Sequence, residues 1–227
     1  MLGRLMRAMH APVYRRRLEV LVREILPALR PNDRVLDVGC GNGTLGRALL
    51  DAPGAPPGLV VEGLERVRRG NEPIAVHAYD GGAIPFAARA YDVLIVADVL
   101  HHERAPEALL RECARVAGRL VIVKDHRVEG WFSQARVSFM DWAANAPYGV
   151  PCLYEYPSRA GWTERARRSG LRAERELHRM DLYPPGWNLV FGGRLQYMAF
   201  LTPESQAPAG INAPADVTAA RGEAVRA

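Results

Sequence analysis

Three glycines at alternate positions, Gly39, Gly41 and Gly43, constrain this chain more than any other feature. They follow a short apolar run, residues 35–38, whose composition predicts a buried strand. Residues 44–50 beyond them have the spacing of a helix. Because glycine lacks a Cβ, it adopts positive φ and lets backbone N–H groups approach a ligand beside a helix N-terminus. The stretch therefore predicts the strand, turn and helix that open a nucleotide-binding βαβ unit.

The glycine stretch admits two kinds of ligand. Gly41, Gly43 and Gly46 formally match the G-x-G-x-x-G pattern of dinucleotide-binding proteins, which predicts a nicotinamide-dependent oxidoreductase. Asp37, two residues before the first glycine, argues against that interpretation because its carboxylate would repel the two phosphates of a dinucleotide. The same carboxylate would attract a ligand that carries positive charge. The charge argument thus favours a cationic ligand at this turn.

Length and composition indicate a folded globular protein. The 227 residues are enough for one large domain or at most two small ones. Hydrophobic residues make up 48% of the chain and charged residues 24%, which excludes wholesale disorder. The net charge is +5, and the arginines are spread over several predicted helices, so we expect no nucleic-acid surface.

We expect a soluble protein of the cytoplasm. The N-terminus lacks the continuous apolar segment of a secretory signal, and no apolar run approaches the roughly 20 residues that span a bilayer. Peripheral contact of the arginine-rich N-terminal segment with a membrane surface stays open. The cysteines Cys40, Cys113 and Cys152 are too few and too widely spaced for a disulfide framework or a zinc site, so no metal is expected.

Strands and helices alternate along the first half of the chain. Apolar runs predict further strands at residues 59–64, 74–78, 91–97 and 119–124, with a helix at 106–116 between the last two. This alternation predicts a doubly wound parallel sheet, in which ligands bind at the carboxyl ends of the strands. The polar residues at the predicted strand ends are Asp37, Glu65, Asp80, Asp98 and the run Lys124, Asp125, His126. Because all five predicted strands end in polar residues, we predict one site along that edge of the sheet.

In combination, the motifs resemble those of class I S-adenosylmethionine-dependent methyltransferases, in particular the type 11 group that acts on small molecules. The resemblance covers residues 35–123. It rests on Leu-Asp-Val-Gly-Cys-Gly-Asn-Gly at the glycine turn, on Asp80 followed by Ile-Pro-Phe, and on Val-Leu-His-His after the fourth predicted strand. It implies a Rossmann-like, seven-stranded sheet between two helical layers, mostly parallel with an antiparallel last strand. It also implies S-adenosylmethionine as the cofactor.

The resemblance further implies roles for individual residues of these motifs. Glu65 would accept hydrogen bonds from the ribose hydroxyls, with Glu62 as the competing candidate. Asp80 would receive the adenine amine, although it also fits the start of a turn before two glycines. The implied cofactor-binding residues are Asp37, Gly39, Cys40, Gly41, Gly43, Glu65, Tyr79, Asp80, Gly81 and Asp98.

The chain as a whole is expected to divide into three parts. Residues 1–30 form an N-terminal helical segment that packs on the core or caps it, and residues 31–203 form the methyltransferase domain. Within that domain, residues 128–157 concentrate aromatic side chains without clear periodicity, either as an apolar wall at the pocket mouth or as a satellite core. Residues 204–227 lack apolar periodicity and are expected to be disordered.

Histidines near the ends of the fourth and fifth predicted strands are the candidate catalytic residues. Methyl transfer requires in-line positioning, exclusion of water and removal of a proton from the nucleophile. His102 and His126 are the candidate bases, with His101 beside them, because a neutral imidazole accepts a proton near pH 7. The predicted reaction is methyl transfer to an oxygen, nitrogen or carbon nucleophile of a small, partly apolar molecule. The alternatives left open are a nicotinamide-dependent oxidoreductase and a methyltransferase-like protein that binds without catalysis.

Overall fold

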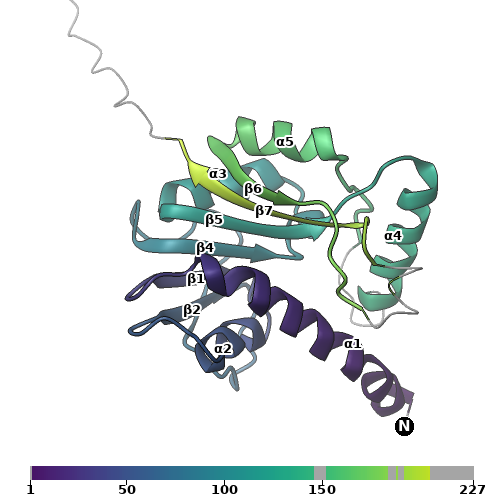
Figure 1. Cartoon of the computed structure of the whole chain (residues 1–227), viewed down its shortest axis with the longest axis horizontal. Coiled ribbons are helices and arrows are strands. Elements are labelled where there is room, and N and C mark those ends of the chain that lie inside the picture. The colour runs from purple at the N-terminus through teal and green to yellow at the C-terminus, as the bar shows by residue number, and fades with distance from the viewer. Residues whose placement is uncertain (1, 146–151, 184–187, 189–191, 205–227) are drawn as a thin grey trace, which may run out of the picture.

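The computed structural model of the chain describes residues 2–145, 152–183, 188 and 192–204. In these residues, seven strands form one sheet with helices on both faces (Figure 1). The strands are β1 (Arg34–Val38), β2 (Val60–Glu65), β3 (Val76–Ala78), β4 (Tyr91–Ala97), β5 (Ala117–His126), β6 (Leu171–Leu177) and β7 (Gln196–Pro203). The helices are α1 (Leu2–Ile25), α2 (Thr44–Asp51), α3 (Pro106–Val116), α4 (Trp131–Asn145) and α5 (Arg159–Arg168), with short 3₁₀ turns η1 (Leu26–Ala28) and η2 (Leu100–His102).

The strand order is β3-β2-β1-β4-β5-β7-β6, which confirms the doubly wound sheet. β1 to β5 pair in parallel, and β7 runs antiparallel to both β5 and β6. The chain reverses its direction of winding between β1 and β4. Ligands of open α/β sheets bind outside the carboxyl ends of the strands at such a switch point.

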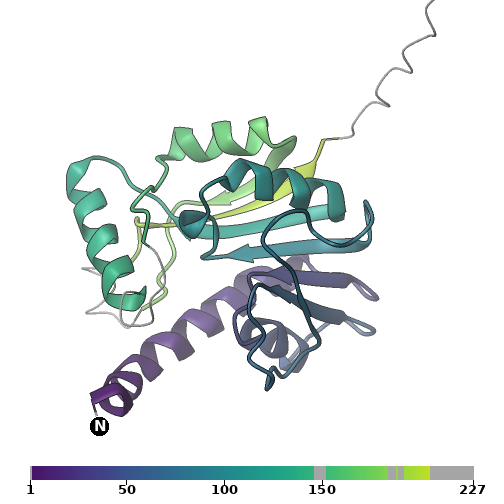
Figure 2. The same cartoon turned by 180° about the vertical axis from the view of Figure 1, so that it is seen from behind.

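Two apolar layers hold the helices against the sheet and give the expected three-layer αβα arrangement. On one face, Leu21 and Ile25 of α1 and Leu49 of α2 are fully buried against the strands. On the other face, α3 and α5 bury Leu110 and Trp162 in a second cluster (Figure 2). Burial of apolar side chains on both faces explains why the central strands read as continuous hydrophobic runs.

Helix α4 occupies half of the segment in which the sequence showed no clear periodicity. Its inward residues include Val137 and Asp141, which are buried. The aromatic side chains of α4 that are more than half exposed are Trp131, Phe132, Phe139 and Trp142. Because its largest apolar residues face outward and a carboxylate faces inward, the hydrophobic pattern did not reveal the helix. α4 lies beyond the end of the sheet to which β5 leads (Figures 1 and 2).

The bounds of β1, β2, β3 and β5 differ from those predicted, and the differences in β5 and β3 are the larger ones. β5 continues to His126 because its antiparallel pairing with β7 extends through Asp125 and His126, so the polar run after residue 123 belongs to the strand. β3 is confined to Val76–Ala78, where it pairs with β2 at the edge of the sheet. Of the tail expected at residues 204–227, only Glu204 lies among the described residues.

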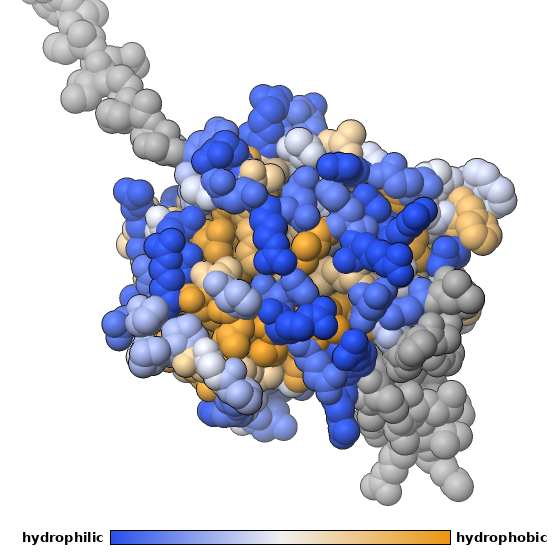
Figure 3. All heavy atoms as spheres, viewed as in Figure 1, coloured by the Kyte–Doolittle hydropathy of each residue, from blue (hydrophilic) through white to orange (hydrophobic). Residues whose placement is uncertain are grey.

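The surface of the face seen in Figure 3 mixes hydrophilic and hydrophobic side chains. Within the part of the chain that the structure describes, no helix has the length and apolar character needed to cross a membrane.

The second half of α1 should contribute strongly to stability because it is packed on the sheet. Leu21→Ala removes a fully buried side chain and is expected to lower the free energy of unfolding by about 2–5 kcal/mol, measured by urea denaturation. Arg15→Ala, at an exposed position of the same helix, should change it by less than about 0.5 kcal/mol. Equal effects of the two substitutions would contradict the packing of α1 on the core.

Candidate functional site

The carboxyl ends of β1, β2 and β4 lie side by side at the switch point. Val38 pairs with Leu64 on one side and with Val96 on the other. Glu65 therefore follows this row by one residue and Asp98 by two. The register of the sheet brings predicted site residues from three strands to one edge.

The glycine turn after β1 adopts the backbone that glycine allows. φ is 68° at Gly39, 59° at Gly41 and 73° at Gly43, the last of which precedes α2. A Cβ on Gly39 would lie 2.5 Å from Cγ2 of Val99, so no larger residue fits there without a shift. A Cβ on Gly41 would meet no atom within 4 Å. The turn is thus open at Gly41, as close approach of a ligand requires.

Glu65 connects the end of β2 to the glycine turn. Its Oε2 accepts a hydrogen bond from the N–H of Gly41 at 2.7 Å, and its Oε1 accepts one from the N–H of Arg66 at 2.8 Å. Glu62, the competing candidate, accepts a hydrogen bond from the hydroxyl of Tyr91 instead. Glu65 is therefore the carboxylate that lies against the predicted cofactor loop.

Burial at this turn raises the pKa values of Cys40 and Asp37. The Cys40 side chain packs over Gly63, where a Cβ would overlap its sulfur. Burial raises the pKa of the Cys40 thiol to about 12, so it stays protonated. Burial also raises the pKa of Asp37 to about 7, with the charge of Arg17 opposing the rise and Glu65 adding to it. A cationic ligand beside Asp37 would favour its ionised form, so the residues at this turn fit the ammonium and sulfonium of S-adenosylmethionine.

Asp98 is held by two cations that approach from different elements. Arg17 of α1 donates from Nε to Oδ2 at 3.1 Å and also from its terminal nitrogen, and Lys124 of β5 donates to Oδ1. Lys124 is only 1% exposed. Although burial alone would raise the pKa of Asp98, Lys124 and Arg17 hold it well below its usual range. The sequence analysis missed Arg17, which is separated from Asp98 by 81 positions.

The residues predicted to bind adenine lie around a turn after β3. Asp80 is exposed, and its Oδ1 accepts a hydrogen bond from the N–H of Gly82 at 2.8 Å, which is its role as a turn residue. Tyr79 is half-buried, and burial raises the pKa of its hydroxyl. The side chain of Arg66 lies where a Cβ on Gly81 would be, and it reaches Glu103 at 2.8 Å. Arg66 is thus a further charged residue beside this turn.

A cluster of histidines lies at the ends of β4 and β5. His101 is buried, and its Nδ1 is 2.7 Å from Oδ1 of Asp125. The ring centroids of His101 and His102 are 3.9 Å apart, and those of His101 and His126 are 5.2 Å apart. His102 is half-buried, whereas His126 is buried. The structure therefore brings both candidate bases together with His101 and a carboxylate partner.

The pKa values of His126 and His101 are shifted in opposite directions. Burial, with the charge of Lys124 adding to it, lowers the pKa of His126 to about 4, so His126 is neutral at pH 7. For His101, burial alone would lower the pKa, but the adjacent Asp125 raises it above its usual value. The two buried imidazoles thus have opposite preferences for the proton.

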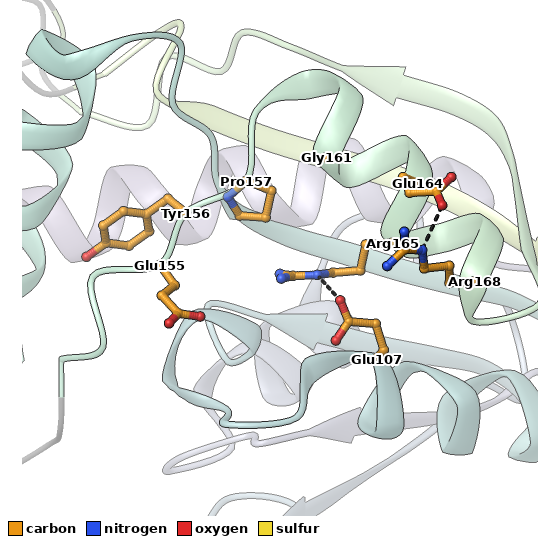
Figure 4. Close-up of a pocket in the computed structure, with 8 residues that line it drawn as sticks. All are labelled: Glu107, Glu155, Tyr156, Pro157, Gly161, Glu164, Arg165 and Arg168. Carbon is orange, nitrogen blue, oxygen red and sulfur yellow. Dashed lines mark hydrogen bonds and ion pairs between the residues drawn. The ribbon is translucent and has the colours of Figure 1, made fainter.

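A hollow of about 350 Å³ lies between α3, α5 and residues 155–157 (Figure 4). Four of its five charged side chains form ion pairs, since Nε of Arg165 lies 3.0 Å from Oε1 of Glu107 and Nε of Arg168 lies 2.7 Å from Oε1 of Glu164. The predicted cofactor-binding residues are all described, and none of them lines this hollow. It is therefore separate from the strand-end site, although Tyr156 belongs both to its wall and to the surroundings of the histidines.

Comparison with known proteins gives the class of this chain. A family model described as a methyltransferase domain matches residues 10–176. A tRNA U34 carboxymethyltransferase from Methylococcus capsulatus is 39% identical over 100 residues, which cover 39% of this chain and 31% of that protein. The chain thus matches about a third of the length of that relative.

Two solved structures are similar over most of their length. One is a chain of the complex between the Haloferax volcanii Trm112 methyltransferase activator and a methyltransferase, with a TM-score of 0.62 and 16% identity over 87% of this chain and 92% of that chain. The other is a SAM-dependent methyltransferase from Thermotoga maritima, with a TM-score of 0.62 and 14% identity over 89% of this chain and 95% of that chain. At these identities the two structures show the fold.

The family match covers most of the chain, and the sheet order agrees with it. The chain belongs to the methyltransferase domain family and is a class I S-adenosylmethionine-dependent methyltransferase, as its motifs predicted.

A cation bound beside Asp37 should displace a proton. The pKa of Asp37 is about 7 in the free protein, and a neighbouring positive charge lowers the pKa of a carboxyl group. S-adenosylmethionine should therefore bind with proton release, and its affinity should rise between about pH 6 and pH 8. Calorimetric titration in two buffers of different ionisation enthalpy measures the number of protons released.

The matched controls are two Asp→Asn variants. Asp37→Asn should abolish the proton release, whereas Asp51→Asn, at an exposed residue of α2 paired with Arg47, should leave it unchanged. Proton release that persists in Asp37→Asn would contradict the assignment.

Proposed function

We propose that the protein transfers a methyl group from S-adenosylmethionine to an oxygen, nitrogen or carbon nucleophile of a small, partly apolar molecule. The observation that carries this proposal is the convergence of Asp37, Glu65 and Asp98 at the switch point, next to the histidines at the ends of β4 and β5. The three carboxyl groups suit a cationic nucleoside, and the histidines suit an acceptor. The cofactor supplies a methyl group that its sulfonium has already activated, so the protein has to bind, orient and exclude water.

The proposed cofactor site follows the glycine turn. Asp37 faces the methionine ammonium, because its raised pKa indicates a buried carboxyl group that a positive charge would stabilise. Glu65 is proposed to bind the ribose hydroxyls with the acceptor capacity that its two backbone hydrogen bonds leave. Tyr79, Asp80 and Gly81 are proposed to lie along the adenine. The backbone of Gly39, Cys40, Gly41 and Gly43 and the side chain of Asp98 complete the proposed set.

Burial of the acceptor side supports a small substrate. His101 and Asp141 are 4% and 2% exposed, with α4 and Tyr156 around them. The inner side of α4 adds apolar surface, since Val137 and Tyr156 form a buried cluster. This enclosed setting suits a small acceptor with an apolar part better than an extended macromolecular surface.

His102 is the proposed catalytic residue on the acceptor side, with His126 as the second candidate. His102 is half-buried at the end of η2, so a bound molecule can contact it, whereas His126 is buried. We propose that His102 contacts the nucleophilic atom of the acceptor and helps to orient it.

An acceptor screen tests the proposed reaction. Wild-type protein with S-adenosylmethionine is offered panels of hydroxylated, amino and carbon-acid compounds, with unmodified tRNA as a parallel arm because the curated relative is named for tRNA. Formation of S-adenosylhomocysteine with a small molecule but not with tRNA is the expected result. Turnover with tRNA alone would contradict the small-molecule proposal.

Substitution of His102 should reduce turnover of the identified acceptor. His102→Ala is expected to lower kcat by about 100-fold, because loss of a group that orients the nucleophile misplaces the reacting atoms. Binding of S-adenosylmethionine should change little. His77→Ala, at a histidine of β3 paired with Glu62, is the matched control and should keep full activity. If kcat in His102→Ala equals that in His77→Ala, His102 has no part in the reaction.

A further inference from the structure

We propose that His101, His102 and Asp141 form a binding site for one divalent transition-metal ion. The two histidines end η2, and Asp141 reaches them from α4, which follows β5. One potential ligand atom of each residue lies within 4.8 Å of those of the other two. Two imidazoles and one carboxylate are a donor set that zinc, cobalt and iron accept, and three protein ligands leave a coordination position open.

The distances require only a small closure around an ion. Nε2 of His101 and Oδ1 of Asp141 are 3.7 Å apart. Two ligand atoms on a tetrahedral ion with bonds of about 2.1 Å lie about 3.4 Å apart. The separations from His102 are within 4.8 Å, so its half-buried ring would have to move by about 1 Å to complete the site.

The hydrogen bonds around His101 are those expected of a histidine that binds a metal. Nδ1–H of His101 donates to Asp125, which leaves the lone pair of Nε2 directed away from that carboxylate. Asp125 is itself fixed by the N–H groups of His126 at 2.6 Å and of His101 at 3.3 Å. Metal-bound histidines characteristically donate their second nitrogen to a carboxylate in this way.

Asp141 is oriented in the same manner. The hydroxyl of Tyr156 donates to its Oδ2 at 2.6 Å, so its Oδ1 is the oxygen nearest His101. Hydrogen bonds to a ligating carboxylate fix its position before an ion binds. Both buried ligands are thus held by partners that are themselves buried.

A charged imidazole bridge is the competing explanation of this cluster. A protonated His101 between Asp125 and Asp141 would satisfy the same two short distances. Such a bridge makes no use of His102, and it would bind no metal. The two explanations therefore differ in a measurable property.

The role of the ion rests on the proposed function, although its binding does not. An acceptor hydroxyl at the open position would have its pKa lowered by the ion, and its proton would leave to water. The oxygen would then use a lone pair to form the new bond to the methyl carbon while the bond from that carbon to the sulfonium sulfur breaks. The sulfur keeps the electron pair of the broken bond, and S-adenosylhomocysteine leaves. This assigns the acceptor to the class of alcohols, phenols and enols, and His102 would then orient the nucleophile through the ion in place of the direct contact proposed above.

Titration with Co²⁺ tests the site without reference to activity. Untagged full-length protein, dialysed against a chelator and then freed of it, is titrated with Co²⁺ while its visible ligand-field absorption is recorded. The proposal predicts an absorption band that saturates at one Co²⁺ per chain and is displaced by Zn²⁺. His102→Ala and Asp125→Asn should weaken Co²⁺ binding by about 10- to 100-fold. His77→Ala should bind as wild type, because His77 lies on β3 beside Glu62.

The possible outcomes test metal binding independently of methyl transfer. Absence of the band in folded wild-type protein, or equal Co²⁺ affinity in His102→Ala and His77→Ala, would overturn the proposal and favour the imidazole bridge. Should Asp125→Asn fail to fold, His102→Ala decides, because His102 is half-buried and ends a short turn. Saturable Co²⁺ binding in a protein that methylates no acceptor would support the site and refute the proposed function.

Discussion

The ion-pair group of Arg17, Asp98 and Lys124 is the constraint on which the site depends. Lys124 is buried within β5, and a buried ammonium without a partner would be strongly destabilising. Asp98, at the end of β4, accepts a hydrogen bond from this ammonium. Its φ is 57°, an uncommon value for a residue other than glycine. Its second oxygen binds Arg17, so the same carboxylate fixes α1 across the carboxyl edge of the sheet. One carboxylate thus connects two strands and the N-terminal helix at the switch point.

This arrangement determines the charge that a cofactor meets. Asp37, Glu65 and Asp98 contribute three carboxyl groups at the edge, whereas Arg17 and Lys124 contribute two cations. Asp98 is fully committed to those cations, and Asp37 is left with a pKa of about 7. The site therefore favours a ligand with net positive charge, which S-adenosylmethionine has, whereas the phosphates give a dinucleotide a net negative charge.

The sequence predicted what depends on local pattern. Buried parallel strands are continuous apolar runs, and glycines mark the turn, so the positions of β1 to β5 along the chain and of the loop after β1 could be anticipated. The partners of the site residues could not, because they come from distant segments: Arg17 lies 81 positions from Asp98, and Asp125 lies 24 from His101. Helix α4 could not be predicted for another reason. Its aromatic residues face outward and its Asp141 is buried, which reverses the usual pattern of apolar residues inside and polar residues outside. His101 was named beside His102 and His126, but its central place in the cluster could not be predicted, because its carboxylate partners come from β5 and α4.

The central claim is that the edge formed by β1, β2 and β4 binds S-adenosylmethionine. Parallel calorimetric titrations of the full chain with S-adenosylmethionine, S-adenosylhomocysteine and NADH test it most directly, with Asp80→Ala as the site variant. We expect one binding site of micromolar affinity for the first two compounds, weakened in Asp80→Ala, and no heat of binding with NADH. Binding of NADH by a folded protein that ignores both S-adenosyl compounds would contradict it.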